Sequence, residues 1–207
     1  MSKMKTGLIA AVLVSMSGTA FSEEHEGMYV LGAVGKTKVS VPRDAANSDY
    51  QNTAGVVGLT SNKTNNPTAY KLQLGYQFNP NFALEGGYIR FGKVAYHSTS
   101  ASGTGDATHT LNAWNLSAVG ILPLQNSWSV LGKLGLAYVR SSASGSSNWG
   151  GVYSFSRDDS KKDLTYGLGV KYDFSNAVFM EAGLDNYKSG TQFGRLNVWS
   201  IGAGMKF

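Results

Sequence analysis

The nine residues YKLQLGYQF, from Tyr70 to Phe78, decide the fold of this chain. Every even-numbered position in this stretch is tyrosine, leucine or phenylalanine. The positions between them are polar or glycine: Lys71, Gln73, Gly75 and Gln77. A helix would bring Leu72 and Tyr76 together but would scatter the other apolar side chains, so the period of two predicts a β-strand with one apolar face.

The same alternation recurs along most of the chain. It is clear in residues 128–138, 164–174 and 198–207, and weaker in residues 28–36, 82–91, 111–122 and 178–184. With the first stretch these windows predict eight strands, an even number. In residues 111–122 the alternation slips near Val119 and Ile121, which predicts a β-bulge there.

An internal match supports two hairpins. The residues from Leu74 to Gly87 recur, without a gap, from Val170 to Gly183. Directly opposed residues share a face of a sheet, so the match predicts three-residue turns at 79–81 and 175–177. The pairs expected to face each other across these turns are Phe78 with Phe82 and Phe174 with Val178.

The connections between the predicted strands alternate in length. Short connections are expected at 79–81, 123–127 and 175–177, and long ones at 37–67, 92–110, 141–162 and 188–196. The long ones are rich in Gly, Ser, Asn and Thr, which is typical of loops. Three short turns on one side and four long loops on the other is the layout of outer-membrane barrels.

Composition excludes several other classes of protein. The 207 residues include no cysteine, so disulfide scaffolds and thiolate metal sites are excluded. The 26 glycines follow no collagen period, and a net charge of +5 with no basic stripe argues against a nucleic-acid surface. Residues 1–22 combine Lys3 and Lys5 with a short apolar run and small residues near Ser22, which predicts a cleaved secretory signal peptide.

Two kinds of eight-stranded barrel fit these patterns. A soluble barrel turns its apolar side chains inward around a ligand, whereas a membrane barrel turns them outward to lipid. Here the apolar faces carry many large residues, and the opposite faces carry glycine, serine and a few charged groups that fit a narrow interior. Aromatic residues also gather at strand ends, as Tyr76, Trp128 and Phe174 do, which favours a membrane barrel.

Several short motifs carry a family resemblance. They are GYQFNP at 75–80, LEGGY at 84–88, GKLG at 132–135 and VWSIGAGMKF at 198–207. In this order they resemble the transmembrane domain of outer membrane protein A and related small outer-membrane barrels. The resemblance implies an all-β, closed, up-and-down, eight-stranded antiparallel transmembrane barrel over residues 23–207, in the outer membrane of a Gram-negative bacterium.

The resemblance also implies a role for the C-terminal strand. Its outward alternating residues resemble the signal that the barrel-assembly machinery of the outer membrane reads. These residues are Trp199, Ile201, Ala203, Met205 and Phe207. No cofactor and no metal are implied.

Charged residues on the inward face predict a network inside the barrel. By alternation these are Lys71, Glu85, Lys133, Lys171, Glu181, Asp185 and Lys206. The hairpin register predicts a Lys171–Glu181 pair, and Glu85 is expected to meet Lys133 across the interior, since buried charges need partners. Such a network either fills and orders the interior or lines a narrow ion path.

The histidines suggest no strong catalytic site. Lipid A deacylases and acyltransferases among small outer-membrane barrels use His and Ser, but His97 and Ser98 are adjacent and their side chains are expected to diverge. His25 lies among three glutamates, which fits a solvated tail better than a metal site. We therefore expect a protein that is not an enzyme.

The expected function is a structural and surface role in the outer membrane. The four long loops are the candidates for contact with surface ligands. The basic residues Lys36, Lys38, Arg43, Arg90 and Lys93 are expected near the outer rim, where lipopolysaccharide phosphates lie. The alternatives are a small passive pore and, less favoured, a lipid A-modifying enzyme.

Overall fold

Nine β-strands make up the described part of the chain. The computed structural model describes residues 27–40, 60–63, 66–100, 103–147, 153–188 and 195–207. The strands are β1 (Gly27–Ser40), β2 (Thr60–Lys63), β3 (Thr68–Asn79), β4 (Phe82–Ser100), β5 (Gly103–Pro123), β6 (Trp128–Ser147), β7 (Tyr153–Asp173), β8 (Val178–Lys188) and β9 (Arg195–Lys206). Within these ranges no helix is long and apolar enough to cross a membrane. The predicted signal peptide lies outside the described residues.

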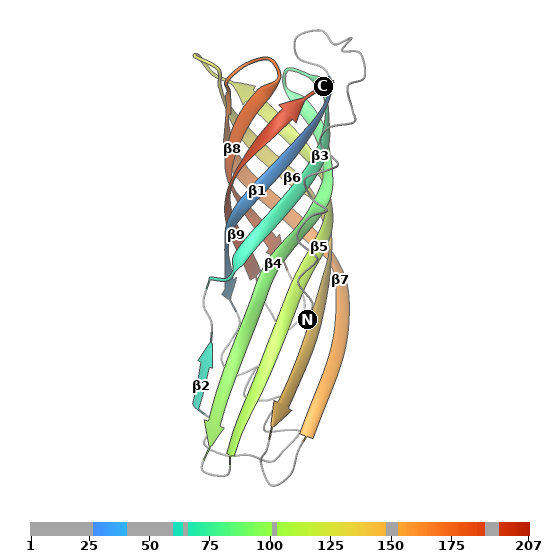
Figure 1. Cartoon of the computed structure of the whole chain (residues 1–207). Helices are drawn as coiled ribbons and strands as arrows, with labels where there is room; N and C mark the ends of the chain where they lie inside the picture. The colour runs from blue at the N-terminus through green and yellow to red at the C-terminus, as the bar shows by residue number, and fades with distance from the viewer. Residues whose placement is uncertain (1–26, 41–59, 64–65, 101–102, 148–152, 189–194) are drawn as a thin grey trace, which may run out of the picture.

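Eight of the strands close into an antiparallel barrel (Figure 1). Each strand pairs with its neighbour in the chain, β2 aside, and β1 closes the barrel by pairing with β9, as the sequence predicts. Followed once around the barrel, the register that leaves β1 at Tyr29 returns to it at Val39, ten residues further along. This stagger tilts the strands and removes both edges of the sheet, which lipid requires.

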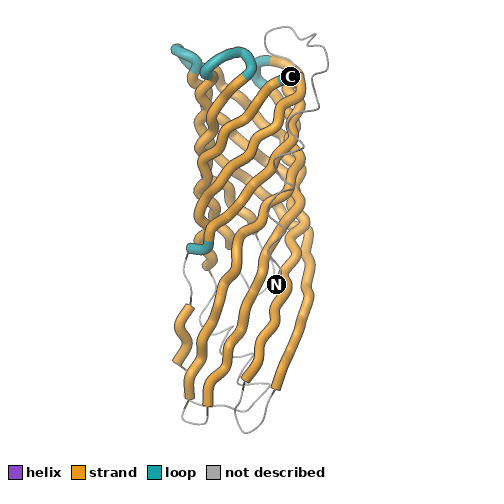
Figure 2. The backbone as a smooth tube through the Cα atoms, in the orientation of Figure 1, coloured by secondary structure: helices purple, strands orange, loops and turns teal. Residues whose placement is uncertain are grey.

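Four strands are much longer than the sequence predicts. In Figures 1 and 2, β4, β5, β6 and β7 continue well beyond the level at which the other barrel strands end. β3 pairs with β4 only as far as Arg90, and β8 pairs with β7 only as far as Thr165. We call the continuation, residues 92–100, 103–111, 141–147 and 153–164 together with β2, the sheet extension.

The predicted loops 92–110 and 141–162 are therefore wrong over most of their length. The ladder between β4 and β5 runs on to Ser100 opposite Gly103, and the ladder between β6 and β7 runs on to Ser147 opposite Tyr153. Parts of the other two predicted loops are also strand, at 37–40, 60–63 and 195–196. Away from lipid, outward positions have no need of apolar side chains, so the alternation disappears while the backbone hydrogen bonds continue.

Of the two predicted turns, the first is shifted by one residue and the second is confirmed. Asn79 pairs with Phe82, because Phe78 is the extra residue of a bulge, so the expected Phe78–Phe82 pair is wrong. Asn79 tightens this turn, since its Oδ1 accepts hydrogen bonds from the backbone N–H groups of Asn81 (2.8 Å) and Phe82 (2.9 Å). In the second hairpin Asp173 pairs with Phe179 and the Phe174 N–H donates to the Val178 carbonyl (3.0 Å), so Phe174 lies opposite Val178 and residues 175–177 form the turn, as predicted.

The bulge predicted near Val119 and Ile121 is also wrong. The register of β5 with β4 and β6 is regular there, and both side chains point into the interior without any slip. The second bulge of the described barrel lies instead at Phe91 of β4, next to Gly92. Gly92 has φ +87°, a conformation that favours glycine, and the bulge reverses the facing of all later residues of β4.

The outward face of the barrel is apolar, as predicted. Leu72, Leu134 and Leu168 are each about three-fifths exposed. Aromatic side chains form one band near the short turns and another near the base of the sheet extension. The exposed members of the first band are Tyr76, Phe78, Phe82, Trp128, Phe174 and Phe207, and those of the second are Tyr70, Trp114, Tyr166 and Trp199. Two aromatic bands flanking an apolar belt mark the two interfaces of a bilayer.

Candidate functional site

The seven charged residues predicted to point inward all lie on the interior face of the barrel. They come from β3, β4, β6, β7, β8 and β9, so the network joins every hairpin. Lys71, Glu85, Lys171, Glu181 and Asp185 are buried, and Lys133 and Lys206 are partly exposed. An interior this narrow keeps such groups within reach of one another, which is the condition for charge burial.

Lys133 holds the centre of this network. Its Nζ lies 2.8 Å from Glu85 Oε2, the partner expected from the sequence, and 2.8 Å from Glu181 Oε1. Lys71 Nζ lies 2.9 Å from Asp185 Oδ2 and 3.8 Å from Glu181 Oε1. Five side chains from four strands thus form one continuous chain of ion pairs, which we call the ionic cluster.

The expected Lys171–Glu181 ion pair is wrong. The two residues are opposed in the register of β7 and β8, but Glu181 is drawn toward Lys133 and Lys71 in the barrel interior. Lys171 Nζ lies instead 3.4 Å from Asp173 Oδ2, and Lys206 Nζ lies 2.7 Å from Asp173 Oδ1. The register fixes which backbone groups pair, but a long side chain can reach charged groups on several strands of the interior.

The sequence reasoning missed two members of the interior network. Asp173 completes a balance of four lysines against four carboxylates, and its inward position follows from the alternation of β7. The Tyr29 hydroxyl donates a 2.7 Å hydrogen bond to Glu85 Oε1. Tyr29 could not be placed because the alternation of β1 is ambiguous, as glycine and alanine occupy both of its faces.

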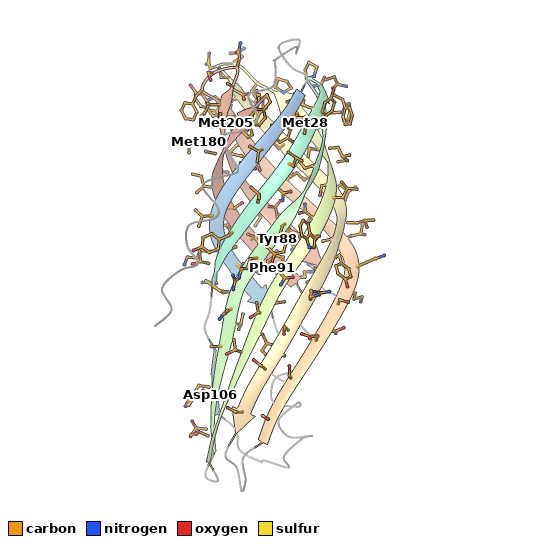
Figure 3. The ribbon with its side chains drawn as sticks, turned by 45° about the vertical axis from the view of Figure 1, so that its right-hand side comes forward. Met28, Tyr88, Phe91, Asp106, Met180 and Met205 are labelled. Atoms are coloured by element: carbon orange, nitrogen blue, oxygen red, sulfur yellow. The ribbon has the colours of Figure 1, made fainter. Side chains whose placement is uncertain are left out.

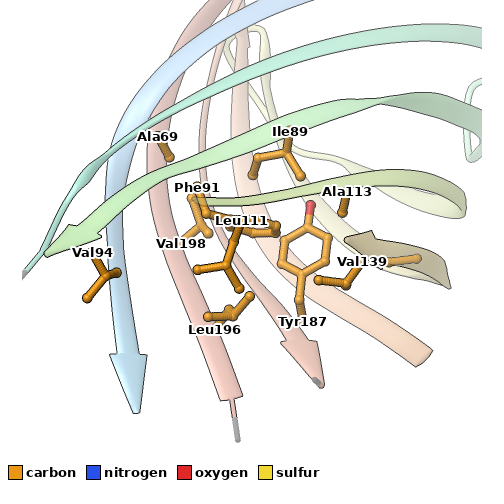
Figure 4. Close-up of a cluster of buried hydrophobic side chains, with 11 residues drawn as sticks. Ala69, Ile89, Phe91, Val94, Leu111, Ala113, Val139, Tyr187, Leu196 and Val198 are labelled. Carbon is orange, nitrogen blue, oxygen red and sulfur yellow. The ribbon is translucent and has the colours of Figure 1, made fainter. Parts of the chain in front are cut away.

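Apolar side chains close the interior on both sides of the ionic cluster. Towards the short turns, Phe179 packs edge-on against Tyr29 with ring centroids 5.7 Å apart. Towards the sheet extension, Phe91 and Tyr187 pack with centroids 5.0 Å apart (Figure 4). Their buried neighbours in this second layer include Ile89, Leu111, Val139, Leu196 and Val198.

Little free space remains in the described interior. A cavity of about 10 Å³ lies beside Tyr29, Phe179 and Glu181, which is room for about one water molecule. The arrangement therefore consists of an apolar layer, an ionic layer and a second apolar layer. Such an arrangement can order the barrel.

The sheet extension has one covered edge and one open edge. β2 pairs with residues 96–99 of β4. On the other side, residues 153–164 of β7 pair with β6 but have no second partner among the described residues. An unpaired edge presents backbone donors and acceptors to any extended segment, and charged residues along it restrain indiscriminate pairing. The charged residues on this edge are Arg157, Asp158, Asp159, Lys161, Lys162 and Asp163.

The outward face of the sheet extension is rich in hydroxyl groups. Its described residues include Thr99, Thr104, Thr108, Thr110, Ser142, Ser144, Ser146, Ser154, Ser156 and Ser160. His97 lies on this face, where its Nδ1 is 2.7 Å from Asp106 Oδ1 (Asp106 is labelled in Figure 3). The side chains of His97 and Asp106 are both exposed. Ser98 follows His97 in β4, and its backbone is paired with Ser61 of β2.

The residues of the predicted assembly signal lie on the outward face of β9 and at its end. Trp199 is 63% exposed and Ile201 is 52% exposed, and Ala203, Met205 and Phe207 continue the row. Met205 lies in Figure 3 at the same end of the barrel as Met28 and Met180. The Phe207 N–H donates a 2.8 Å hydrogen bond to the Met28 carbonyl, so the last residue is fixed to β1.

Comparison with known proteins supports this architecture. The family model for the "Outer membrane protein beta-barrel domain" matches residues 6–207. No curated protein sequence matches the chain.

Three solved structures share the fold. Ail, the attachment invasion locus protein of Yersinia pestis, is similar with 17% identity and a TM-score of 0.54 over 88% of this chain and 99% of Ail, in its complex with the heparin analogue sucrose octasulfate. OprG from Pseudomonas aeruginosa shows 14% identity and a TM-score of 0.53 over 88% of this chain and 97% of its own. The N-terminal barrel domain of Pseudomonas aeruginosa OprF shows 14% identity and a TM-score of 0.52 over 88% and 99%. At such identities the likeness concerns the fold alone.

Proposed function

Because the chain belongs to the outer membrane protein β-barrel family, and its place is the outer membrane of a Gram-negative bacterium, we propose that its barrel is a closed anchor. The anchor holds the sheet extension outside the cell as the surface that meets other molecules. One observation carries this proposal: β4 to β7 run on as a sheet beyond a barrel whose interior is filled.

The filled interior supports an anchor over a passive pore. A pore needs a continuous watery path, whereas the described interior combines two apolar layers with a paired ionic cluster. Buried ion pairs specify one arrangement of the side chains that they join. In this proposal the ionic cluster fixes the strands that continue into the sheet extension, and it has no catalytic role.

The sheet extension offers two modes of contact. The open edge of β7 provides unpaired backbone groups for an extended partner segment. The hydroxyl-rich outward face provides side chains that both donate and accept hydrogen bonds. The ligand seen with Ail is a sulfated saccharide, and it makes saccharides the first class to test on this chain.

Cysteine labelling on intact cells tests the proposed orientation. The natural chain has no cysteine, so a single introduced thiol reports only on its own position. We propose Thr108→Cys in the sheet extension and Asn126→Cys in a short turn, each probed with a membrane-impermeant maleimide. Thr108→Cys is expected to react in intact cells, and Asn126→Cys only after the outer membrane has been permeabilised.

The reverse labelling pattern would contradict the proposal. If Asn126→Cys reacted in intact cells and Thr108→Cys did not, the sheet extension would point into the periplasm. Equal labelling of both in intact cells would show a barrel that is not inserted. The unsubstituted protein is the control, because it has no thiol to label.

We also propose that the C-terminal strand carries the assembly signal. Five alternating residues of this strand face outward, and Phe207 ends the row. This row lies on the lipid-facing side, where it is accessible to the assembly machinery before the barrel closes with β1.

A further inference from the structure

Two lysines at the short-turn end of the barrel interior share a single carboxylate. Lys206 Nζ lies 2.7 Å from Asp173 Oδ1, and Lys171 Nζ lies 3.4 Å from Asp173 Oδ2. The other interior carboxylates are paired with Lys133 and Lys71 in the ionic cluster. Among the described residues, this end of the interior therefore has two ammonium groups for one carboxylate. We call Lys171, Asp173 and Lys206 the basic mouth.

The basic mouth lies at the edge of the interior, where solvent reaches it. The side chains of Lys206 and Asp173 are about a quarter exposed. On the inner side lies Phe179, whose ring centroid is 5.7 Å from Lys171 Nζ and 6.0 Å from Lys206 Nζ. The three short turns contain no charged residue: 79–82, 123–128 and 174–178. They therefore offer the two lysines no further carboxylate.

The first strand of the barrel begins beside the basic mouth. Tyr29 of β1 lies opposite Lys206 of β9, and Gly27, the first residue of β1, lies about 7 Å further along the strand. Gly27 has φ +143°, a conformation that favours glycine, so the backbone departs there from the extended path of β1. Gly27 also lies opposite Gln77, whose side chain lines the same small cavity as Lys171 and Lys206. The chain therefore enters the barrel next to the two lysines.

The residues that precede β1 are acidic. They read Glu23-Glu24-His25-Glu26, and they lie outside the described residues. The sequence alone fits a solvated tail, but the structure adds a basic partner at the point where this tail joins the barrel. Cleavage after Ser22, as the sequence predicts, leaves four residues, which span about 13 Å when extended. β1 and β7 are three strand spacings apart, about 14 Å, so with their side chains these residues are long enough to reach both lysines.

We propose that residues 23–26 fold back over the basic mouth, where Glu24 and Glu26 form ion pairs with Lys206 and Lys171. Carboxylates and ammonium groups form short, charge-assisted hydrogen bonds with each other. The segment is joined directly to β1, so it competes with free anions at a high effective concentration. Its carboxylates supply the partners that the described part of the mouth lacks.

The basic residues on the outward face are too far away to compete for this segment. Those that the sequence places near the outer rim lie at the opposite end of the barrel, close to the base of the sheet extension. They are Lys36, Lys38, Arg90 and Lys93, and Arg43 lies outside the described residues. The pairing closes the short-turn end of the interior and holds the first residues of the mature chain against β9 and β7.

Zero-length crosslinking of the mature protein tests the proposal. The protein is isolated from the outer membrane, placed in phospholipid nanodiscs and treated with a carbodiimide, which joins a carboxylate to an amine only when the two are in contact. Mass spectrometry of the digested protein identifies each new bond. The bond between Asp173 and Lys206 is the internal control, since their charged atoms are 2.7 Å apart. Bonds from Glu24 or Glu26 to the two lysines are expected in comparable yield.

Substitutions measure whether charge holds the segment in place. Glu24→Gln/Glu26→Gln is expected to lower the urea midpoint of unfolding by roughly 0.3 M, and by less than half as much when Lys206→Gln is also present. His25→Gln leaves all three carboxylates of the segment in place, and this matched control is expected to leave the midpoint unchanged. Circular dichroism confirms that each variant is folded before unfolding is measured.

Several results would overturn the proposal. One is the absence of any bond between the segment and the two lysines in a sample where Asp173 and Lys206 are joined. Another is an equal effect of Glu24→Gln/Glu26→Gln with and without Lys206. If added sulfate abolished the bonds to the segment and left the Asp173 bond intact, the mouth would be a site for free anions. The intact mass gives the first residue of the mature chain, and a chain that begins after Glu26 would lack the segment altogether.

Discussion

Lys133 is the residue on which the interior depends most. Its ammonium group is the direct partner of both Glu85 and Glu181 and lies among side chains that are almost fully buried. Removing one partner of a buried ion pair leaves an uncompensated charge, which is the costly case. Without Lys133, the two glutamates lose the ammonium group that they share.

We expect Lys133→Met to lower the free energy of unfolding by about 3 to 5 kcal/mol. Urea unfolding of the protein in lipid vesicles at neutral pH measures the change. Lys206→Met is the comparison, because the Lys206 side chain is 26% exposed and partly solvated beside Asp173. A loss for Lys133→Met no larger than that for Lys206→Met would show that the ionic cluster does not stabilise the barrel.

Substitutions at two glycines, one facing inward and one facing outward, test how tightly the interior is packed. A Cβ atom at Gly75 would lie 2.2 Å from Cζ of Tyr29, whose ring is held by Glu85 and Phe179. At Gly32, on the outward face, a Cβ would meet nothing within 4 Å. We expect Gly75→Ala to destabilise the barrel by about 1 to 3 kcal/mol and Gly32→Ala to be nearly neutral. Equal urea midpoints for the two variants would contradict this packing.

The alternation of single residues predicted the interior charges but not all of their contacts. The period of two predicts that Lys171 and Glu181 point inward, and this prediction needs only the neighbouring residues of the same strand. Glu181 has its partners on other strands, Lys133 of β6 and Lys71 of β3, and Lys171 is left to pair with Asp173 of its own strand. Which carboxylate Lys171 meets therefore depends on distances across the barrel. No pattern within one hairpin contains those distances.

At the scale of the strands, the sheet extension and the barrel are separable. The ionic cluster lies wholly on the short-turn side of the level at which β3 begins and β8 ends. We expect a variant with 92–110 and 141–159 each replaced by Asn-Gly to fold into the same barrel. Its unfolding free energy should fall by roughly 1.5 to 3 kcal/mol, the value of burying one valine such as Val94.

Urea unfolding and circular dichroism of this shortened protein measure the prediction. A two-residue Asn-Gly turn is chosen because it matches the twist of an antiparallel hairpin. A variant with scrambled sequence in 92–110 and unchanged length is the control for chain length. Failure of the shortened protein to fold would show that the sheet extension is part of the folding unit.

The C-terminal strand gives a second prediction at this scale. Deleting Phe207 removes one hydrogen bond to Met28 and the last member of the outward row. We expect the deletion variant to refold in detergent like the full protein but to accumulate in the periplasm of cells. Cell fractionation measures the outcome, with Lys206→Met as the control for a change at an inward-facing neighbour. Normal membrane levels of the deletion variant would contradict an assembly signal at Phe207.

At the scale of the whole molecule, the layered interior predicts an electrically silent barrel. We expect no discrete conductance steps when the protein is inserted into planar bilayers at moderate voltage. Its insertion is verified in the same preparation by circular dichroism of matching vesicles. Reproducible steps that change when Lys133 is replaced would show an open path through the ionic cluster and would favour the pore.

The sequence by itself determined the barrel. Period-two alternation, the match between the two hairpins and the aromatic strand ends are local properties, and they specify eight strands, their order and their outward face. The lengths of β4 to β7 were not determined in this way. Outside lipid, the outward positions do not need apolar side chains. A stretch rich in Ser, Thr and Gly therefore predicts a loop, although the backbone ladder continues through it.

Only the tertiary structure decided which groups meet. The register around the closed barrel sets the levels of residues on different strands, and this brought five charged side chains into the ionic cluster. Each residue's facing is encoded by its neighbours along the chain. Its partners are set by the stagger of ten residues that closure imposes, because closure couples strands that are far apart in the sequence.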